Sequence, residues 1–171
     1  MNGLIPASDA FNWPTLNIRP EKIVAITDYL KDQGVLYLLG AKAVPIDIDL
    51  SEIKELDCSG FFDVAVYHST AETGEPLTLV DGSSNLFDFF TAQGFKVSDY
   101  ESACGLDKYL RVGILLASDT PEGIGHIVFG WQGWTCECHG PHGQVGVGRR
   151  EISALGFAQH MHWFVLAVES D

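Results

Sequence analysis

Basic residues are scarce in this chain of 171 residues: 10 lysines and arginines stand against 23 aspartates and glutamates, which gives a formal net charge of -13. A surface of that sign repels phosphate backbones and anionic headgroups, so we expect neither a nucleic-acid nor a membrane partner. Long apolar runs are missing as well, since none approaches the roughly 20 residues that a membrane-spanning helix needs. The first residues, MNGLIPASDAFNWP, have neither a positive start nor a sustained apolar stretch, so we expect no general secretory signal peptide, and the sequence leaves the localisation unknown.

Cysteine is also infrequent, with four residues: Cys58, Cys104, Cys136 and Cys138. Small disulfide-bonded folds use more cysteine per residue, so reduced thiols are the better expectation. The pair Cys136 and Cys138, with His139 and Cys104, suggests a zinc site. However, Cys-x-Cys is not the Cys-x-x-Cys knuckle of structural zinc sites, and no second pair follows at a familiar spacing. We therefore expect no metal and no organic cofactor.

The segments that are present change in character along the chain. Three segments with helical spacing of apolar residues come first: 20–34, 58–70 and 81–95. Short β-branched and aromatic segments separated by glycine or proline come later: 111–118, 125–132, 134–140 and 162–170. Helices followed by strands predict an α+β fold in which N-terminal helices pack on a C-terminal antiparallel sheet. We expect a single domain over residues 1–171, with an irregular lead-in (1–19), a helical half (20–94) and a sheet half (110–171).

Cys58 is the first candidate for chemistry. It begins the helical segment CSGFFDVAVYHST, directly after Asp57 and before Ser59 and Gly60. A helix N-terminus favours the thiolate form of a cysteine, and small neighbours leave room for a substrate carbonyl and for backbone N–H groups that hold an oxyanion. The plain alternative is a buried structural thiol. A nucleophile also requires a base.

His126 is the candidate base, because it begins the predicted strand HIVFGW. In the next predicted strand, Glu137 and His139 lie two residues apart and therefore on one face. Either side chain could orient the His126 ring as the third member of a catalytic triad.

Four motifs in this order resemble the NlpC-type cell-wall cysteine peptidases, a papain-like family that cleaves peptidoglycan stem peptides. They are GVLYLLG (34–40), DCSGF (57–61), GHI (125–127) and the strand TCECHG (135–140). The resemblance covers roughly residues 34 to 148, most of the chain. One departure is RVGIL (111–115), where the family often has a Gly-Asp-Leu strand.

The resemblance implies a role for each matched residue. Cys58 would be the nucleophile and His126 the general base, with Tyr37 lining the site. Glu137 aligns with the family's third residue, whereas His139 is the commoner chemical type and is preferred on that ground; both stay open. Asp57 and Ser59, which flank the cysteine, are candidate substrate-binding residues.

Arg149 is a further candidate for substrate binding. Arg149 and Arg150 are the only adjacent basic pair in this acidic chain, and they end a glycine-rich run. An arginine there could bind a substrate carboxylate in a bidentate fashion. The plain alternative is a flexible hairpin tip.

The resemblance implies a cysteine endopeptidase or amidase that cleaves stem peptides, most simply at the D-glutamyl–diamino acid bond. We expect delivery to the wall by a phage or a secretion apparatus, as for a phage lysin or a secreted effector, with an immunity protein as a candidate partner. Two alternatives remain: an acyltransferase or non-wall amidase on the same papain-like scaffold, and a non-catalytic binding module.

Overall fold

The computed structural model describes residues 4–5, 13–140 and 145–169. Its centre is an antiparallel sheet of six strands in the described residues, in the order β5-β10-β6-β7-β8-β9. These strands are β5 (Val97–Ser98), β6 (Tyr109–Leu115), β7 (His126–Trp131), β8 (Trp134–Cys138), β9 (Val147–Gly148) and β10 (His162–Val168). The expected mixture of helices and a largely C-terminal antiparallel sheet is therefore present.

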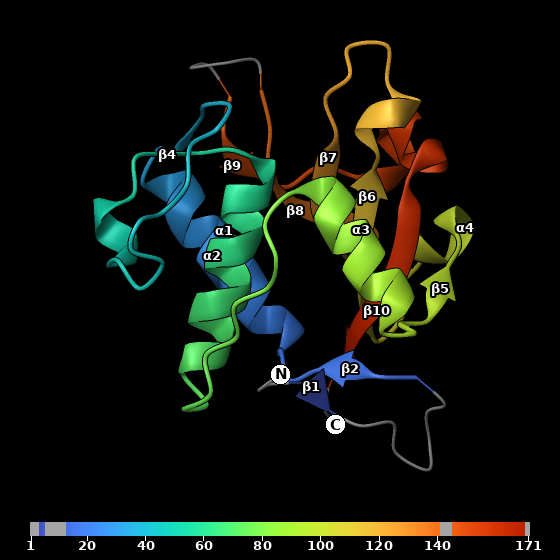
Figure 1. Cartoon of the computed structure of the whole chain (residues 1–171), viewed down its shortest axis with the longest axis horizontal. Helices are drawn as coiled ribbons and strands as arrows, with labels where there is room; N and C mark the ends of the chain where they lie inside the picture. Colours follow the sequence, from blue (N-terminus) through green and yellow to red (C-terminus); the bar gives the residue numbers. More distant parts are fainter. Residues whose placement is uncertain (1–3, 6–12, 141–144, 170–171) are drawn as a thin grey trace.

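The longer helices cover one face of this sheet, whereas the shortest one packs with the cluster on the other face. The described helices are α1 (Pro20–Asp32), α2 (Cys58–Ala71), α3 (Ser83–Ala92) and the short α4 (Tyr100–Ala103). α1 and α2 lie side by side against the β7–β9 end of the sheet, and α3 lies over β6 (Figure 1). In the described part of the chain, no helix is long and apolar enough to cross a membrane.

The opposite face carries a smaller apolar cluster. The turns η3 (Ile152–Ala154) and η4 (Gly156–His160) contribute Ile152 and Ala158, which pack with Val128 of β7 and Trp163 of β10. The sheet is therefore buried on both sides near β7, and polar side chains there need partners.

Helix α2 differs from the single apolar stripe that its sequence suggested. Its buried residues surround the helix, and they include Phe61, Phe62, Val66 and Thr70. Phe62 stacks on Phe129 of β7 with ring centroids 4.7 Å apart, and Phe61 meets the same ring edge-on at 6.1 Å. The helix is enclosed by α1, the sheet and the preceding loop, so no face of its first turns is left to water.

Short strands replace parts of the chain that we expected to be irregular. In the lead-in, β1 (Leu4–Ile5) pairs with β2 (Thr15–Leu16), while residues 1–3 and 6–12 lie outside the described residues. In the connection before α2, β3 (Leu36–Tyr37) pairs in parallel with β4 (Glu55–Leu56), and the 3₁₀ turn η1 (Leu50–Glu52) lies between them in the chain.

A backbone clasp joins this connection to the strand side of the molecule. Tyr37 N–H donates to the carbonyl of Val145 at 2.7 Å, and Val147 N–H donates to that of Val35 at 3.2 Å. Gly146 lies between them, and a Cβ built there would sit 1.9 Å from the Val35 carbonyl oxygen. Only glycine allows the two backbones to approach this closely.

Candidate active site

Cys58 is the first residue of α2, at the end of the helix that faces the sheet. Asp57 is the N-cap, and its carboxylate accepts the Gly60 N–H at 2.6 Å. Cys58 exposes 9% of its surface. The thiol therefore stands at the positive end of the helix dipole and is largely withdrawn from water.

Gly60, two residues after Cys58, occupies a position that has no room for a side chain. A Cβ at this position would lie 2.6 Å from the Ala41 carbonyl oxygen and 2.9 Å from Asp57 Oδ1. The incoming loop thus runs directly against the first turn of α2, and Asp57 N–H donates to the same Ala41 carbonyl. This close approach fixes the point at which the helix begins.

Lys42 connects the two residues that flank the cysteine. Its Nζ lies 2.6 Å from Asp57 Oδ1 and 2.6 Å from Ser59 Oγ. Asp57 and Ser59 are 6% and 5% exposed, respectively. The structure thus places these two predicted substrate-binding residues beneath the helix start, where their polar atoms hold the cap together.

His126, the first residue of β7, brings the candidate base to the thiol. Its Nε2 lies 2.8 Å from Glu137 Oε1, so Nδ1 is the ring nitrogen left for Cys58. Burial lowers the pKa of His126, but hydrogen bonding and charge from Cys58 and Glu137 outweigh it and raise that pKa to about 9. The structure therefore brings Cys58, His126 and Glu137 together and favours a charged imidazolium between two acidic groups.

Glu137, on β8, is fully buried and is held by three side chains. Besides His126, Arg150 contacts both oxygens, with Nη2 2.5 Å from Oε1 and Nε 3.1 Å from Oε2. Thr135 Oγ1 also donates to Oε2. Burial raises the pKa of Glu137, but the bonds to His126 and Arg150 prevail and lower it to about 2. The carboxylate is therefore ionised and fixed in orientation.

His139 lies near this group without joining it. Its Nδ1 is 3.0 Å from the carbonyl oxygen of Gly140. Burial, and next the positive charge of Arg150, lower the pKa of His139. The hydrogen bond to His126 is thus made by Glu137 and not by His139, contrary to the preference drawn from residue type.

Tyr37 and Arg149 occupy different positions relative to the thiol. Burial, followed by the charges of Cys58 and Asp57, raises the pKa of the Tyr37 hydroxyl, which places that side chain in the neighbourhood of the cysteine. Arg149 Nε instead donates to the Thr135 carbonyl at 3.2 Å. Of the adjacent basic pair, the member that reaches the site is therefore Arg150.

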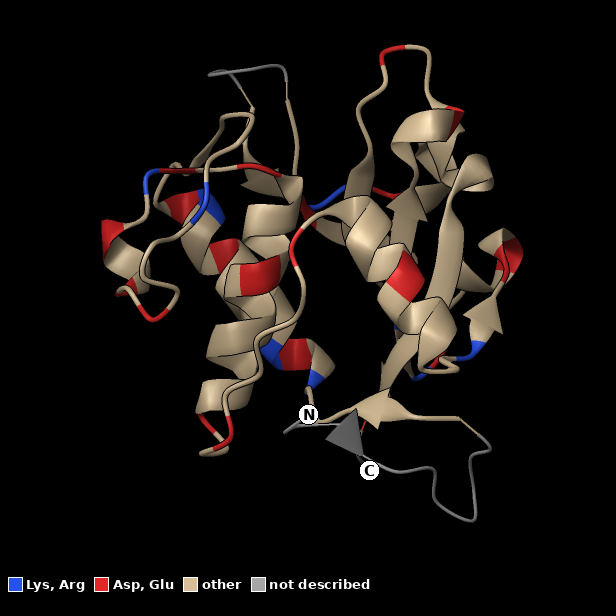
Figure 2. Cartoon of the chain, in the orientation of Figure 1, with Lys and Arg blue, Asp and Glu red and all other residues tan. Residues whose placement is uncertain are grey.

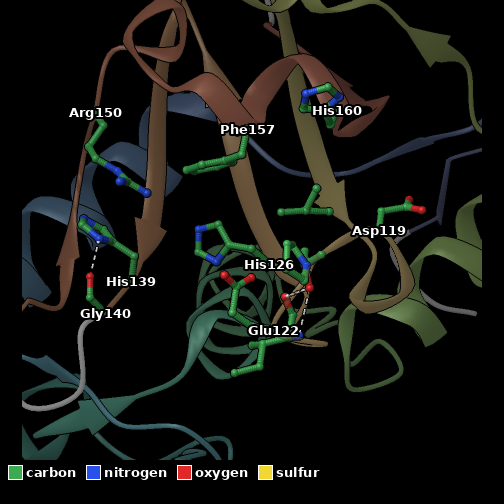
Figure 3. Close-up of a pocket in the computed structure, with 12 residues that line it drawn as sticks. Asp119, Glu122, His126, His139, Gly140, Arg150, Phe157 and His160 are labelled. Carbon is green, nitrogen blue, oxygen red and sulfur yellow. Dashed lines mark hydrogen bonds between the residues drawn. The ribbon is translucent and has the colours of Figure 1, made fainter.

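A pocket of about 470 Å³ opens beside His126 (Figure 3). His139 and Arg150 lie on one side of the imidazole, Asp119 lies on the other, and Phe157 lies over it (Figure 3). The remaining lining residues come from the end of β6, the loop before β7, the segment after β8 and η4: Leu115, Thr120, Pro121, Glu122, Ile124, Gly140 and His160. The walls are thus apolar with charged groups of both signs at the rim.

Acidic residues outnumber basic residues in this chain, by 23 to 10. Figure 2 shows them spread over helices and loops, with few lysines and arginines between. Arg150 has 30% of its side chain exposed and is one of those few cations. One of the few cations in a chain with a formal net charge of -13 therefore lines this pocket.

The cysteines considered as zinc ligands lie apart from the pocket. Cys136 and Cys138 are fully buried, with 0% of their surface exposed, and all four cysteines are free thiols. Burial raises the pKa of Cys136 to about 11 and that of Cys138 to about 12. Within the described ranges, no group of three or more histidine, cysteine, aspartate or glutamate side chains is arranged to hold a metal ion. Cys136 and Cys138 belong to the main apolar core.

Comparisons of the chain with protein-family models, with curated proteins and with solved structures found no match. Function is therefore inferred from the residues of the site and their geometry.

Proposed function

We propose that the protein is a cysteine peptidase of the papain-like NlpC type that cleaves peptidoglycan stem peptides, at the D-glutamyl–diamino acid bond. The observation that carries the proposal is the chain of side-chain contacts from Cys58 to His126 and from His126 to Glu137. A thiol at a helix N-terminus faces an imidazole whose far nitrogen is bound 2.8 Å from a buried carboxylate. Such an arrangement performs nucleophilic catalysis on unrelated folds, because it is defined by geometry and roles.

The residues act in a simple sequence. His126 Nδ1 takes the thiol proton of Cys58, and the resulting thiolate attacks the amide carbon of the substrate. The tetrahedral intermediate collapses when the imidazolium gives its proton to the leaving amine, and a thioester remains. Water, deprotonated by His126, then attacks the thioester, and the released thiolate regains the proton.

The start of α2 supplies hydrogen-bond donors for the oxyanion. The N–H groups in the first turn of an α-helix have no intrahelical acceptor. The Gly60 N–H is taken by Asp57, whereas the Cys58 N–H points from the first position of the helix toward the reacting carbonyl in this proposal. Backbone donors of this kind stabilise developing negative charge more than the neutral ground state.

The pocket beside His126 provides room for the substrate. Its volume of about 470 Å³ is in the range of small-molecule sites, and its open rim suits a segment of peptide. Apolar walls and charged groups of both signs match a stem peptide, which carries short apolar side chains, carboxylates and an amine.

Digestion of defined muropeptides tests the proposal. We expect the wild-type protein to release stem-peptide fragments and Cys58→Ala to lose at least about a thousandfold in kcat/KM, because removal of a nucleophile leaves only binding and oxyanion stabilisation. Cys104→Ala is the matched control, since Cys104 is a partly exposed free thiol outside the site.

Two other outcomes would replace the proposal. Transfer of an acyl group to an added amine, or hydrolysis of amides with no wall fragment released, indicates an acyltransferase or a non-wall amidase. Muropeptide binding that survives in Cys58→Ala, with no turnover by the wild type, indicates a binding module.

A further inference from the structure

Arg150 lies two residues after β9, the strand that covers the edge of β8. Its backbone N–H donates to Thr135 Oγ1 at 2.9 Å, and its carbonyl accepts the Thr135 N–H at 2.8 Å. The residue is therefore held by its main chain beside Glu137 before its side chain makes any contact.

The guanidinium is held on both of its sides. It forms the bidentate contact with Glu137, and its carbon lies 5.4 Å from the centre of the Phe157 ring. The same ring meets His126 edge-on, with centroids 5.8 Å apart. Phe157 thus packs against both cationic groups that share the Glu137 carboxylate.

From this geometry we infer that Arg150 is a positioning residue for the reaction, acting through Glu137. The planar guanidinium fixes the plane of the carboxylate, and the carboxylate in turn directs His126 Nε2, so that Nδ1 faces Cys58. The inference rests on the proposed function in that the oriented imidazole is the catalytic base. It assigns to Arg150 a task different from that expected of Arg149, which was contact with the substrate.

The charge of Glu137 depends on the groups around it. They are His126 from β7, Arg150 from the segment after β9, and Cys138 and His139 from its own strand region. Of these, His126 and Arg150 favour the ionised carboxylate. Loss of Arg150 leaves a fully buried carboxylate with one cationic partner in place of two, so the pKa of Glu137 must rise.

The test compares Arg150→Gln, Arg150→Lys and Arg111→Gln. Arg111 is the matched control: it is buried and makes a bidentate contact with Asp107, at 2.9 and 2.7 Å, and it lies opposite Gly130, toward the end of β7 away from His126. Arg111→Gln therefore removes a similar buried ion pair without touching the site.

We expect Arg150→Gln to lower kcat on muropeptides about tenfold or more with KM changed less than threefold, the order found when outer hydrogen-bonding partners are removed. In protein labelled with ¹³C at the glutamate carboxyl carbons, the Glu137 signal, assigned with Glu137→Gln, should titrate at least one pH unit higher than in the wild type. Arg150→Lys should keep the low pKa of Glu137 but lose part of kcat, because lysine retains the positive charge and cannot make the bidentate contact. Arg111→Gln should lower thermal stability and leave both readouts unchanged.

Either of two results overturns the inference: an unmoved Glu137 titration in folded Arg150→Gln, or a rise in KM with kcat unchanged, which is the result of a substrate contact. A wild type that is inactive on muropeptides while the Glu137 titration shifts as expected rejects the proposed function and leaves the positioning role of Arg150 in place.

Discussion

Glu137 is the residue whose surroundings are most demanding. A fully buried carboxylate is costly unless it is paired and hydrogen-bonded, and here His126, Arg150 and Thr135 all contact it. An arrangement of this cost is typical of a functional site.

Glu137→Gln tests whether the site needs the charge of this carboxylate. We expect kcat to fall about a hundredfold to ten-thousandfold, because an amide of the same shape no longer stabilises the imidazolium. The carboxylate is one of the groups that raise the pKa of His126 to about 9, so its removal lowers that pKa. The basic limb of the pH–kcat profile should therefore move to lower pH.

Glu151→Gln is the control, since Glu151 is exposed and carries the same side chain. An unchanged basic limb in Glu137→Gln would contradict the role given to this carboxylate.

At this scale, the sequence predicts candidate residues best where the signal is local, and the catalytic roles of these residues stay predictions. Cys58 and His126 are each recognised from their immediate neighbours, and the structure places them together. Arg150 was not selected over Arg149, because which of two adjacent side chains faces Glu137 depends on how the segment after β9 lies against β8. Sequence spacing does not determine that register across a connection.

Helix α2 carries the candidate nucleophile at its start, and it also contains a partly buried acid. Asp63 lies one turn into the helix and is hydrogen-bonded to Asp81, while its Oδ1 is buried without a partner in the described part of the chain. Burial, and next the bond and charge of Asp81, raise the pKa of Asp63 to about 8.

Asp63→Asn should stabilise the protein. In the unfolded chain this aspartate ionises near its ordinary pKa of 3.8, whereas in the folded protein it stays neutral up to about pH 8. Folding therefore costs free energy that grows between these two pH values, and a neutral asparagine avoids it. One pKa unit corresponds to about 1.4 kcal/mol, and the side chain is only partly buried, so we expect a gain of at least about 1 kcal/mol in the free energy of unfolding at pH 8 and no gain below pH 3.8.

Urea unfolding at pH 8 and pH 3.5 measures this difference. Asp28→Asn removes an exposed aspartate of α1 and serves as the control. A loss of stability at pH 8 in Asp63→Asn alone would show that the acid is needed in its ionised form.

Elements with strong local signals were predicted, and the shortest ones were not. Pro20 at the first position of α1 and Gly34 after its end mark that helix in the sequence. The two-residue strands β1 to β4 have no room for an alternating pattern, so only the folded chain reveals them. At the start of α3, Gly82 is the N-cap and makes no side-chain hydrogen bond, while Asp81 pairs with Lys42 at 3.2 Å.

At the scale of the whole molecule, the buried groups of the site set a pH window for stability. The pKa of His126 is raised from 6.5 to about 9, so its contribution is fully present below pH 6.5 and is lost as the pH rises through about 9. The pKa of Glu137 is lowered from 4.5 to about 2, so its contribution is present above pH 4.5 and is lost as the pH falls through about 2.

Both contributions coincide between about pH 4.5 and 6.5, and Asp63 shifts the balance further toward the acidic side. We expect the free energy of unfolding, measured by urea titration across pH 3 to 10, to be greatest in that window. In the double variant His126→Gln, Glu137→Gln the curve should flatten. A wild-type maximum above pH 8 would contradict the assignment of charges at the site.

The overall arrangement of helices before strands followed from composition and periodicity. The position of the turns η3 and η4 at the site could not be predicted in the same way. These turns bring Phe157 over His126, but their sequence has little periodic signal. Their positions depend on packing against Val128 and Trp163 from strands far apart in the sequence.

The backbone clasp at Gly146 limits how this protein can vary. With the Val35 carbonyl oxygen 1.9 Å from where a Cβ would stand, each of the other nineteen amino acids would push Tyr37 away from the strand that leads to Arg150. A library randomised at position 146 and selected for folded protein should return glycine alone, whereas position 148, where a Cβ would meet open space, should accept many residues. In a peptidase of the proposed kind, new substrate preferences would therefore have to arise at the rim of the pocket, because position 146 accepts no other residue.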